Sequence, residues 1–291
     1  MILSNDKNIK QIDLSKELVM TDAVNLPFTS MILKNRDKAT STIVNWDYEQ
    51  LDSTRGLAKE GSDVTEFEES NRTTGDSNVC QILRKAVNVS DTAQAVSEEH
   101  IADLFAHELS NRIVEIKRDL EYYLINGVKN DGNDGQARQM NGLLQFVKPE
   151  NKTEVTTALD LKKLQNMAKT MRKAGTAGQD LVLLCDYNTY DIVADLFFEK
   201  TLYQGVTNEF GSPVQKLNLT YASVVPYVID TMPENTCLMV NTDFLKLAEL
   251  RALIYSDLAK TGSSRKGFIE MENTLKVLHP DAITMYSKKT A

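Results

Sequence analysis

The side chains most often used in catalysis and metal binding are sparse in this sequence. It has three histidines in 291 residues, and two of them, His100 and His107, are seven residues apart within one predicted helix. Metal-binding pairs on a helix normally stand four residues apart, as in the pattern H-E-x-x-H, and that pattern is absent. We therefore expect these histidines either to pack against neighbouring side chains or to lie on the surface, and we expect no metal site.

Two loop-like stretches partly match ligand-binding motifs. The stretch from Gly262 to Gly267 has the small and basic residues of a phosphate-binding loop, but it lacks the Gly-Lys-Ser/Thr ending. Residues 127–135 are rich in Gly, Asn and Asp, but they lack the oxygen spacing and the closing Glu of a calcium loop. No Ser or Cys stands in a recognisable nucleophile motif. We expect no catalytic residue, no cofactor and no enzymatic activity.

Composition excludes further classes of protein. A net charge of −8 argues against a protein that grips duplex DNA through a basic face. Cys80, Cys185 and Cys237 are far apart and have apolar neighbours, so we expect reduced, buried thiols from a reducing compartment. The N-terminus lacks the apolar segment of a signal peptide, and apolar runs such as 181–185 are too short to span a membrane. We expect a cytosolic protein without a membrane partner.

The longest periodic pattern covers residues 97–126 and predicts one amphipathic helix. Its apolar residues follow steps of three and four: Ile101, Leu104, Phe105, Leu109, Ile113, Ile116, Leu120, Tyr123 and Leu124. Ser97 is the expected N-cap, and Gly127 follows as a stop. Such a helix is about 45 Å long at about 1.5 Å per residue. Its apolar stripe requires another layer packed along it.

Residues 42–92 have the character of a long hairpin with an acidic tip. Val44, Trp46 and Tyr48 alternate with polar residues, and a second β-like run covers 79–90. The segment between them has too few apolar residues for a core of its own, so the hairpin must lie on another surface. A disordered acidic loop is the alternative. That surface belongs either to its own domain or to a neighbouring subunit. The residues expected to make the contact are Trp46, Tyr48, Arg55, Lys59, Glu60, Asp63 and Glu66.

The remaining pattern predicts an α+β protein. Residues 1–41 are expected to form an N-terminal arm, with a small helical subdomain as the alternative. Thr157 and Asp160 have the spacing of a capping box for a helix over 159–174, and Asp186 caps a helix that extends to about Glu199. Further strands are expected over 181–185, 222–229, 236–240, 252–257, 268–277 and 282–286, with a short helix over 243–250 and a basic loop over 260–266.

Four stretches together carry a resemblance to a known family. They are Asn45-Trp46 with Glu60-Gly61-Ser62-Asp63; Gln81-Ile82 with Val89-Ser90-Asp91-Thr92-Ala93; residues 115–121 with Gly142-Leu143; and residues 259–262 with 272–277. In this order and spacing they resemble the major capsid proteins of tailed bacteriophages, which have the Hong Kong ninety-seven type of capsid fold. The first thirty or so residues match no pattern in particular.

The resemblance implies a structural subunit that self-assembles into hexamers and pentamers, forming the icosahedral head shell around the phage genome. It implies an N-terminal arm (1–41), an extended β-hairpin loop (42–92) that overlaps a neighbour, and a peripheral domain (93–180) with spine helix 97–126. An axial domain (181–250) follows, and 251–291 returns to the peripheral domain.

The implied partners are other copies of the chain, and portal, scaffolding or decoration proteins. Double-stranded DNA would be packaged inside the shell without specific recognition, and the protein would be made in the host bacterial cytoplasm and end in the virion. Two other functions remain open at this point. A non-enzymatic binding module would dock a basic partner through its acidic hairpin, and a hydrolase or nucleotide enzyme would need a motif that this sequence lacks.

Overall fold

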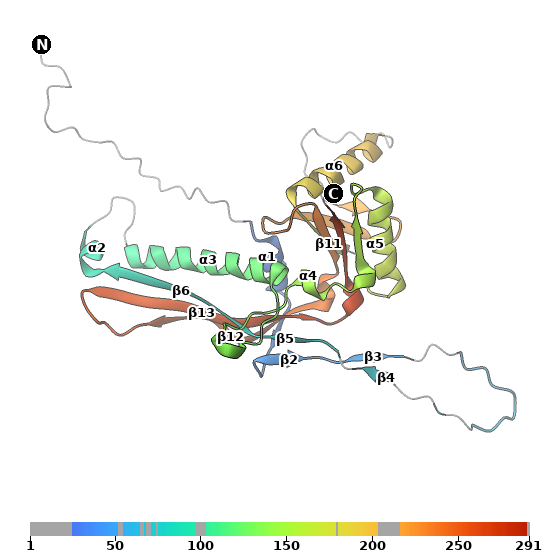
Figure 1. Cartoon of the computed structure of the whole chain (residues 1–291), viewed down its shortest axis with the longest axis horizontal. Coiled ribbons are helices and arrows are strands. Elements are labelled where there is room, and N and C mark those ends of the chain that lie inside the picture. Colours follow the sequence, from blue (N-terminus) through green and yellow to red (C-terminus); the bar gives the residue numbers. More distant parts are fainter. Residues whose placement is uncertain are drawn as a thin grey trace, which may run out of the picture.

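A computed structural model describes residues 25–51, 55–64, 67, 71–73, 75–96, 103–178, 180–202 and 216–289. The described chain forms two β-sheets, a long helix along the first sheet, further helices on the second, and a hairpin that projects from the body (Figure 1). This mixed architecture confirms the predicted α+β class.

The first sheet has four strands in the order β1-β12-β13-β6. These strands are β1 (Arg36–Lys38), β12 (Leu245–Asp257), β13 (Ser264–Val277) and β6 (Gln81–Ser90). β13 pairs antiparallel with both β12 and β6, and β1 adds in parallel to β12. Two register shifts interrupt the β12–β13 ladder between Glu249 and Ile254, whereas the β13–β6 ladder runs without a break.

The second sheet has six strands in the order β7-β14-β11-β8-β10-β9. They are β7 (Lys152–Val155), β14 (Ile283–Lys288), β11 (Thr236–Val240), β8 (Asp180–Cys185), β10 (Ser223–Val228) and β9 (Leu217–Asn218). Helix α5 (Leu161–Lys173) buries Leu164, Met167 and Met171 in the core of this sheet. Helix α6 (Tyr187–Leu202) follows β8, and the Asp186 carboxylate accepts a hydrogen bond from the Thr189 N–H at its start.

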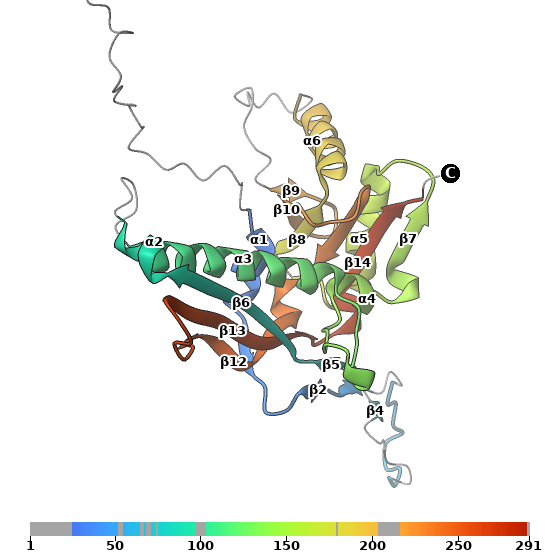
Figure 2. The ribbon, with the colours of Figure 1, turned by 60° about the vertical axis from the view of Figure 1, so that its left-hand side comes forward.

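The long helix is α3 (Leu104–Asn126), which lies along the first sheet beside β6 (Figure 2). The expected start at residue 97 is wrong, because the Asp103 side chain caps this helix by accepting the Ala106 N–H at 3.1 Å. A separate short helix, α2 (Asp91–Ala95), precedes it, with Ser90 as its N-cap. Ser97 and His100 lie outside the described residues.

The apolar stripe of α3 joins the two sheets. Ile116, Leu120 and Leu124 are fully buried in one cluster with Leu275 from the first sheet and Leu238 from the second. Further along, Phe105 packs in a smaller cluster against two β6 valines. The prediction that the stripe needs another layer is confirmed.

The expected helix over 243–250 is wrong. Residues Thr242–Phe244 make one 3₁₀ turn, and the chain then enters β12. The run Leu245-Lys-Leu-Ala-Glu-Leu consists largely of good helix formers, but its intrinsic preference is weak beside tertiary pairing. As a strand it buries Leu245 and Leu247 in the core cluster to which α3 also contributes, while it pairs with β13.

Two other predicted boundaries change. The N-cap of α5 is Asp160, which accepts the Lys163 N–H, so the capping box from Thr157 is not formed. The basic loop ends earlier than expected, because Arg265 and Lys266 belong to β13. Within the segment expected to be an arm, residues Pro27–Ile32 form helix α1, with Pro27 in its first turn.

Strand pairing joins segments that are far apart along the chain. β13 lies beside α3, whereas α5 and β7 belong with the second sheet, and β14 is inserted between β7 and β11. The expected domain ranges, with 93–180 containing the long helix and 251–291 returning to the same domain, stay a prediction.

A buried carboxylate fixes α1 to α3. Glu121 of α3 is 1% exposed, and its oxygens accept the N–H groups of Phe28 (3.3 Å) and Thr29 (2.6 Å). These amides lie in the first turn of α1, where the N-cap residue Leu26 has no side-chain oxygen to offer. Burial raises the pKa of Glu121, the hydrogen bonds from α1 oppose that rise, and Asp230 adds to it.

The corrected start of α3 can be tested with two alanine variants. Asp103→Ala removes the capping oxygen and should lower the free energy of unfolding by about 1 kcal/mol. Ser97→Ala is the matched control and should leave stability unchanged within about 0.5 kcal/mol. Urea unfolding followed by circular dichroism measures both. A larger loss of stability for Ser97→Ala than for Asp103→Ala would indicate that the helix begins near residue 97.

The Glu121 contact predicts a pH-dependent difference in stability. Because the folded pKa lies above the unfolded one, the contribution of Glu121 is fully present below about pH 4.3 and is lost as the pH rises through the folded pKa. Glu121→Gln keeps an acceptor oxygen without the charge, so its stability relative to wild type should improve as the pH is raised from 4 to 8.

Urea unfolding of both proteins across this pH range measures the effect. Glu121→Leu is the control, because it also removes the titrating group but leaves two buried amides without an acceptor, so it should be about 1–3 kcal/mol less stable than Glu121→Gln at every pH. A constant difference between wild type and Glu121→Gln would contradict the assignment.

Candidate functional site

The projecting hairpin is built from two short antiparallel ladders. At its base β2 (Ile43–Asn45) pairs with β5 (Ser77–Val79), and farther out β3 (Tyr48–Gln50) pairs with β4 (Asn71–Thr73). We expected 79–90 to be its second strand, but β6 belongs to the first sheet, where it pairs with β13. The paired strands of the hairpin therefore contain fewer residues than predicted.

An aromatic contact holds the root of the hairpin. Trp46 is 8% exposed, and its ring centroid lies 6.1 Å from that of Phe146. The Trp46 indole N–H donates to the Tyr48 hydroxyl (3.2 Å), which donates to the Asp76 carboxylate (2.7 Å). Burial, and next the hydrogen bond to Asp76, raise the pKa of Tyr48. A Cβ on Gly75 would meet the Trp46 carbonyl oxygen at 1.8 Å, so this approach requires glycine.

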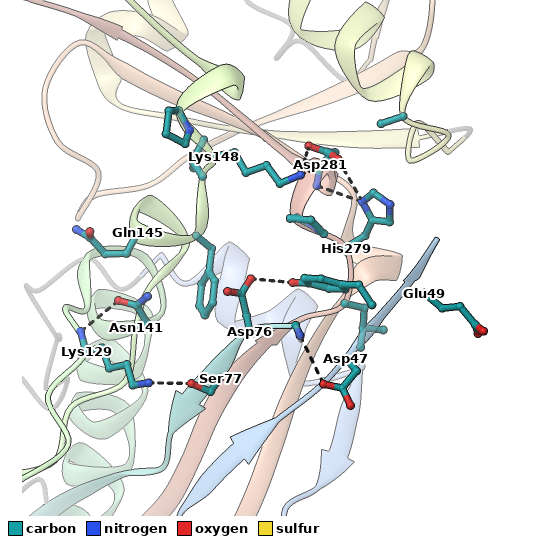
Figure 3. A pocket seen from close by; sticks show the side chains of 18 residues that line it. Asp47, Glu49, Asp76, Ser77, Lys129, Asn141, Gln145, Lys148, His279 and Asp281 are labelled. Carbon is teal, nitrogen blue, oxygen red and sulfur yellow. Dashed lines mark hydrogen bonds and ion pairs between the residues drawn. The ribbon is translucent and has the colours of Figure 1, made fainter. Parts of the chain in front are cut away.

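A groove of about 970 Å³ lies beside this root, between the hairpin and the turn that precedes β14 (Figure 3). On the far side, Lys148 (3.1 Å) and Asn151 (3.0 Å) hold the Asp281 carboxylate, and the His279 Nδ1 accepts the Asp281 N–H (3.1 Å). Burial opposes the charged form of Asp281, but these donors outweigh it and lower the pKa. The carboxylate on this side of the groove is therefore already paired within the chain.

The described residues contain neither a metal-binding cluster nor a membrane-spanning helix. Within the ranges that the structure covers, no group of three or more His, Cys, Asp or Glu side chains is placed to hold a metal ion. No described helix combines the length and the apolar character needed to cross a membrane.

The tip of the hairpin exposes apolar as well as charged side chains. Leu57 is 98% exposed and Phe67 82% exposed, and Leu51 and Val64 are also in solvent. Single exposed apolar residues are common, but four on one projecting loop indicate a contact surface. In the sequence, residues 51–70 contain six acidic and two basic side chains, so the tip carries a net negative charge as well as exposed apolar residues.

The expected contact residues separate into three groups. Trp46 and Tyr48 are bound within their own chain at the root, whereas Arg55, Lys59, Glu60 and Asp63 are exposed at the tip, and Glu66 lies outside the described residues. From the sequence we predicted the charged residues of the tip as contacts but not its apolar residues. A signal for them was present, because Leu57 and Phe67 interrupt a polar run.

A network of ion pairs lies on the first sheet. Register places Glu270 and Glu272 of β13 on the face opposite the one that packs against α3. Arg84 (2.6 Å) and Arg251 (2.6 Å) bind Glu270, and Arg251 (2.9 Å) and Arg138 (2.7 Å) bind Glu272. Burial opposes the charged form of Glu270, but Arg84 and Arg251 outweigh it and lower the pKa.

This network presents cations to the solvent. The two carboxylates are buried, whereas Arg84 and Arg251 remain about half exposed above them. Three arginines stand against two glutamates, so the local charge is positive. The Arg84 guanidinium lies 5.2 Å from the Phe268 ring centroid, and Ile82 and Ile254 of the same face are exposed. We call Ile82, Arg84, Arg251, Ile254 and Phe268 the open-face patch.

The sequence reading did not select any residue of this patch as a contact. Its members come from β6, β12 and β13, which are far apart along the chain and meet only through register. The alternation in 81–90 indicates one exposed face, but it does not identify the neighbouring strand.

Sequence comparisons with known proteins identify a family of capsid proteins. A family model described as SU10 major capsid protein matches residues 2–290. Over 129 residues the chain is 34% identical to the major capsid protein of Escherichia phage Phieco32. That alignment covers 44% of this chain and 36% of the relative, so the match spans about a third of the relative's length.

Solved structures share the fold at low sequence identity. The capsid asymmetric unit of cyanophage A-1(L) superposes with a TM-score of 0.74 at 12% identity, covering 99% of this chain and 98% of the other. The capsid of Myoviridae phage XM1 gives 0.64 at 14% identity, covering 99% of each chain. The holo-SrpI encapsulin complex from Synechococcus elongatus gives 0.58 at 13% identity, covering 93% and 92%.

At these sequence identities the solved structures show the fold alone, and the match to the family model identifies the family. Because that model matches almost the whole chain, this protein belongs to the SU10 major capsid protein family, and the predicted resemblance to major capsid proteins of tailed phages is confirmed.

Proposed function

We propose that the chain is the structural subunit of an icosahedral phage head, and that its copies assemble into hexamers and pentamers around double-stranded DNA. The match of the capsid family model to residues 2–290 carries this proposal, and a capsid fold shared over 99% of the chain supports it. The role requires interfaces between copies and does not require a catalytic residue. The acidic chain offers DNA little electrostatic attraction, in keeping with packaging without specific recognition.

The two sheets correspond to the two domains of such a subunit. We assign α3 and the four-stranded sheet to the peripheral domain, and the six-stranded sheet with α5 and α6 to the axial domain near the capsomer centre. In support, each sheet has its own helices, and α3 joins them through one core. Portal, scaffolding or decoration proteins would bind the assembled shell, which is made in the host cytoplasm and ends in the virion.

We further propose that the hairpin tip of one copy docks on the open-face patch of a neighbour. The tip contributes exposed apolar residues such as Leu57 and carboxylates such as Glu60. The patch contributes exposed Ile82 and Ile254 together with the guanidinium groups of Arg84 and Arg251. Apolar surface would meet apolar surface, and negative charge would meet positive charge.

Such a contact joins two different surfaces of identical chains. Interfaces of this heterologous kind close into rings when the rotation between neighbours permits. Each ring of five or six copies then contains five or six equivalent contacts, so a modest contact is multiplied. The root contact of Trp46 and Tyr48 fixes the direction in which each hairpin leaves its own subunit.

The function can be tested by shortening the hairpin. Because Gln50 pairs with Asn71, residues 51–70 can be replaced by an Asn-Gly turn that preserves the β3–β4 ladder. Wild type should form rings or closed particles by sedimentation velocity and negative-stain microscopy, and the shortened variant should stay small and folded. Closed particles formed by the shortened variant would show that assembly does not require the hairpin tip. Wild type that stays monomeric, even with its scaffolding proteins co-expressed, would contradict the proposed function.

The receiving surface can be tested with two matched substitutions. Ile254 is 55% exposed in the open-face patch, and Val128 is 56% exposed in the loop after α3. Ile254→Asp should reduce the assembled fraction about tenfold or more, since a desolvated carboxylate costs at least about 1.4 kcal/mol per contact. Val128→Asp should assemble as wild type does, and thermal unfolding should show both variants folded.

Equal assembly of the two variants would contradict the assignment of the receiving surface. It would leave the shell function itself intact, because the hairpin could then dock elsewhere on the neighbour.

A further inference from the structure

Two of the three cysteines face one another inside the protein. Cys185 of β8 and Cys237 of β11 are direct partners in the antiparallel ladder. The next pair along has a backbone hydrogen bond from the Asp186 N–H to the Thr236 carbonyl (3.3 Å), so the cysteines occupy a non-hydrogen-bonded position. Opposed Cα atoms at such positions are about 4.5 Å apart, within the range that a disulfide spans.

The surroundings of this pair exclude large reagents and disfavour ionisation of Cys185, so only a small oxidant can react there, and slowly. Both side chains are free thiols and fully buried, in the core that includes Met171, Met239 and Tyr286. Burial, and next the adjacent Cys237 thiol, raise the pKa of Cys185 well above its usual range. A bulky disulfide reagent cannot enter this core, whereas a peroxide is small enough to reach a thiol during brief openings.

We propose that Cys185 and Cys237 are an oxidation site that forms a disulfide between β8 and β11 after the protein leaves the reducing cytoplasm. This rests on the proposed function only for the change of compartment, because a released particle meets peroxides and lacks the cellular reductants.

The reaction balances with a peroxide as oxidant. One thiolate attacks a peroxide oxygen of hydrogen peroxide, forming a sulfenic acid and releasing hydroxide. The second thiol then attacks the sulfenic sulfur, forms the S–S bond and expels the oxygen as water. Two thiols lose two electrons and two protons in total, and one hydrogen peroxide becomes two waters.

The crosslink would tie together the part of the second sheet that carries α6. Residues 186–236 would become a closed loop that contains α6, β9 and β10. Closing a loop of this length restricts the unfolded chain strongly, so the melting temperature should rise by about 5 °C or more. In the reducing cytoplasm the same pair stays open while the subunits fold and assemble.

The test uses the purified, unassembled full-length chain, so its outcome does not depend on shell formation. The protein is incubated with hydrogen peroxide, quenched, unfolded and treated with N-ethylmaleimide. Intact mass should show the loss of two hydrogens and a single maleimide adduct, which peptide mapping places on Cys80. The melting temperature should rise, and dithiothreitol should reverse both changes.

Two variants separate this site from general oxidation. Cys185→Ser should keep two reactive thiols and show no rise in melting temperature, whereas Cys80→Ser should behave as wild type does. Three maleimide adducts on the treated wild type, under conditions that oxidise the unfolded chain, would overturn the proposal. A disulfide that includes Cys80 would overturn it as well.

Discussion

The packing of α3 against both sheets is the interaction on which the rest of the structure depends. Ile116, Leu120 and Leu124 contact strands of the first sheet and of the second within one core. Because each fully buried aliphatic side chain contributes about 1.5–3 kcal/mol, this short stretch fixes the relative position of the two sheets. Glu121, in the same turn of α3, adds α1 to the arrangement through its buried carboxylate. One helix thus positions three separate parts of the chain.

Covering one face of the first sheet has a consequence for the other. Strand residues alternate between faces, so the strands that bury Leu83 and Ile269 against α3 must present Arg84 and Glu270 on the opposite side. The two buried glutamates there are satisfied by arginines whose outer edges remain in solvent. The hairpin exposes apolar side chains that its own subunit does not cover. A shell in which each copy covers its neighbour would resolve both exposures.

The sequence indicated the elements whose signals are local and missed those that depend on partners. The stripe of α3, a hairpin that begins near residue 43, Asp186 as a cap, and the strand over 236–240 follow from periodicity and capping chemistry, and the structure confirms each, although the second strand of the hairpin was misplaced. The helix over 243–250 failed because pairing with β13 overrides helix propensity. The predicted start of α3 was wrong because Asp103 caps this helix as well as Ser97 would. Both residue types suit an N-cap, and only tertiary packing decides between them.

The candidate site shows the same division. An excess of carboxylates in one segment is visible in any reading of residues 47–69, so the charges of the tip were identified. Burial of Trp46 in its own subunit was not predictable, because its partner Phe146 lies a hundred residues away and no periodicity connects them. The open-face patch combines three strands whose order and register are set only in the folded sheet.

The most direct measurement of this account is an electron cryomicroscopy reconstruction of the assembled particle, with side chains resolved at the contacts between subunits. The account predicts that the hairpin tip around Leu57 lies over Ile254 and Arg251 of the adjacent copy, with carboxylates of the tip beside the guanidinium groups. A tip that lies in solvent or on the six-stranded sheet, with the open-face patch bare, would contradict it.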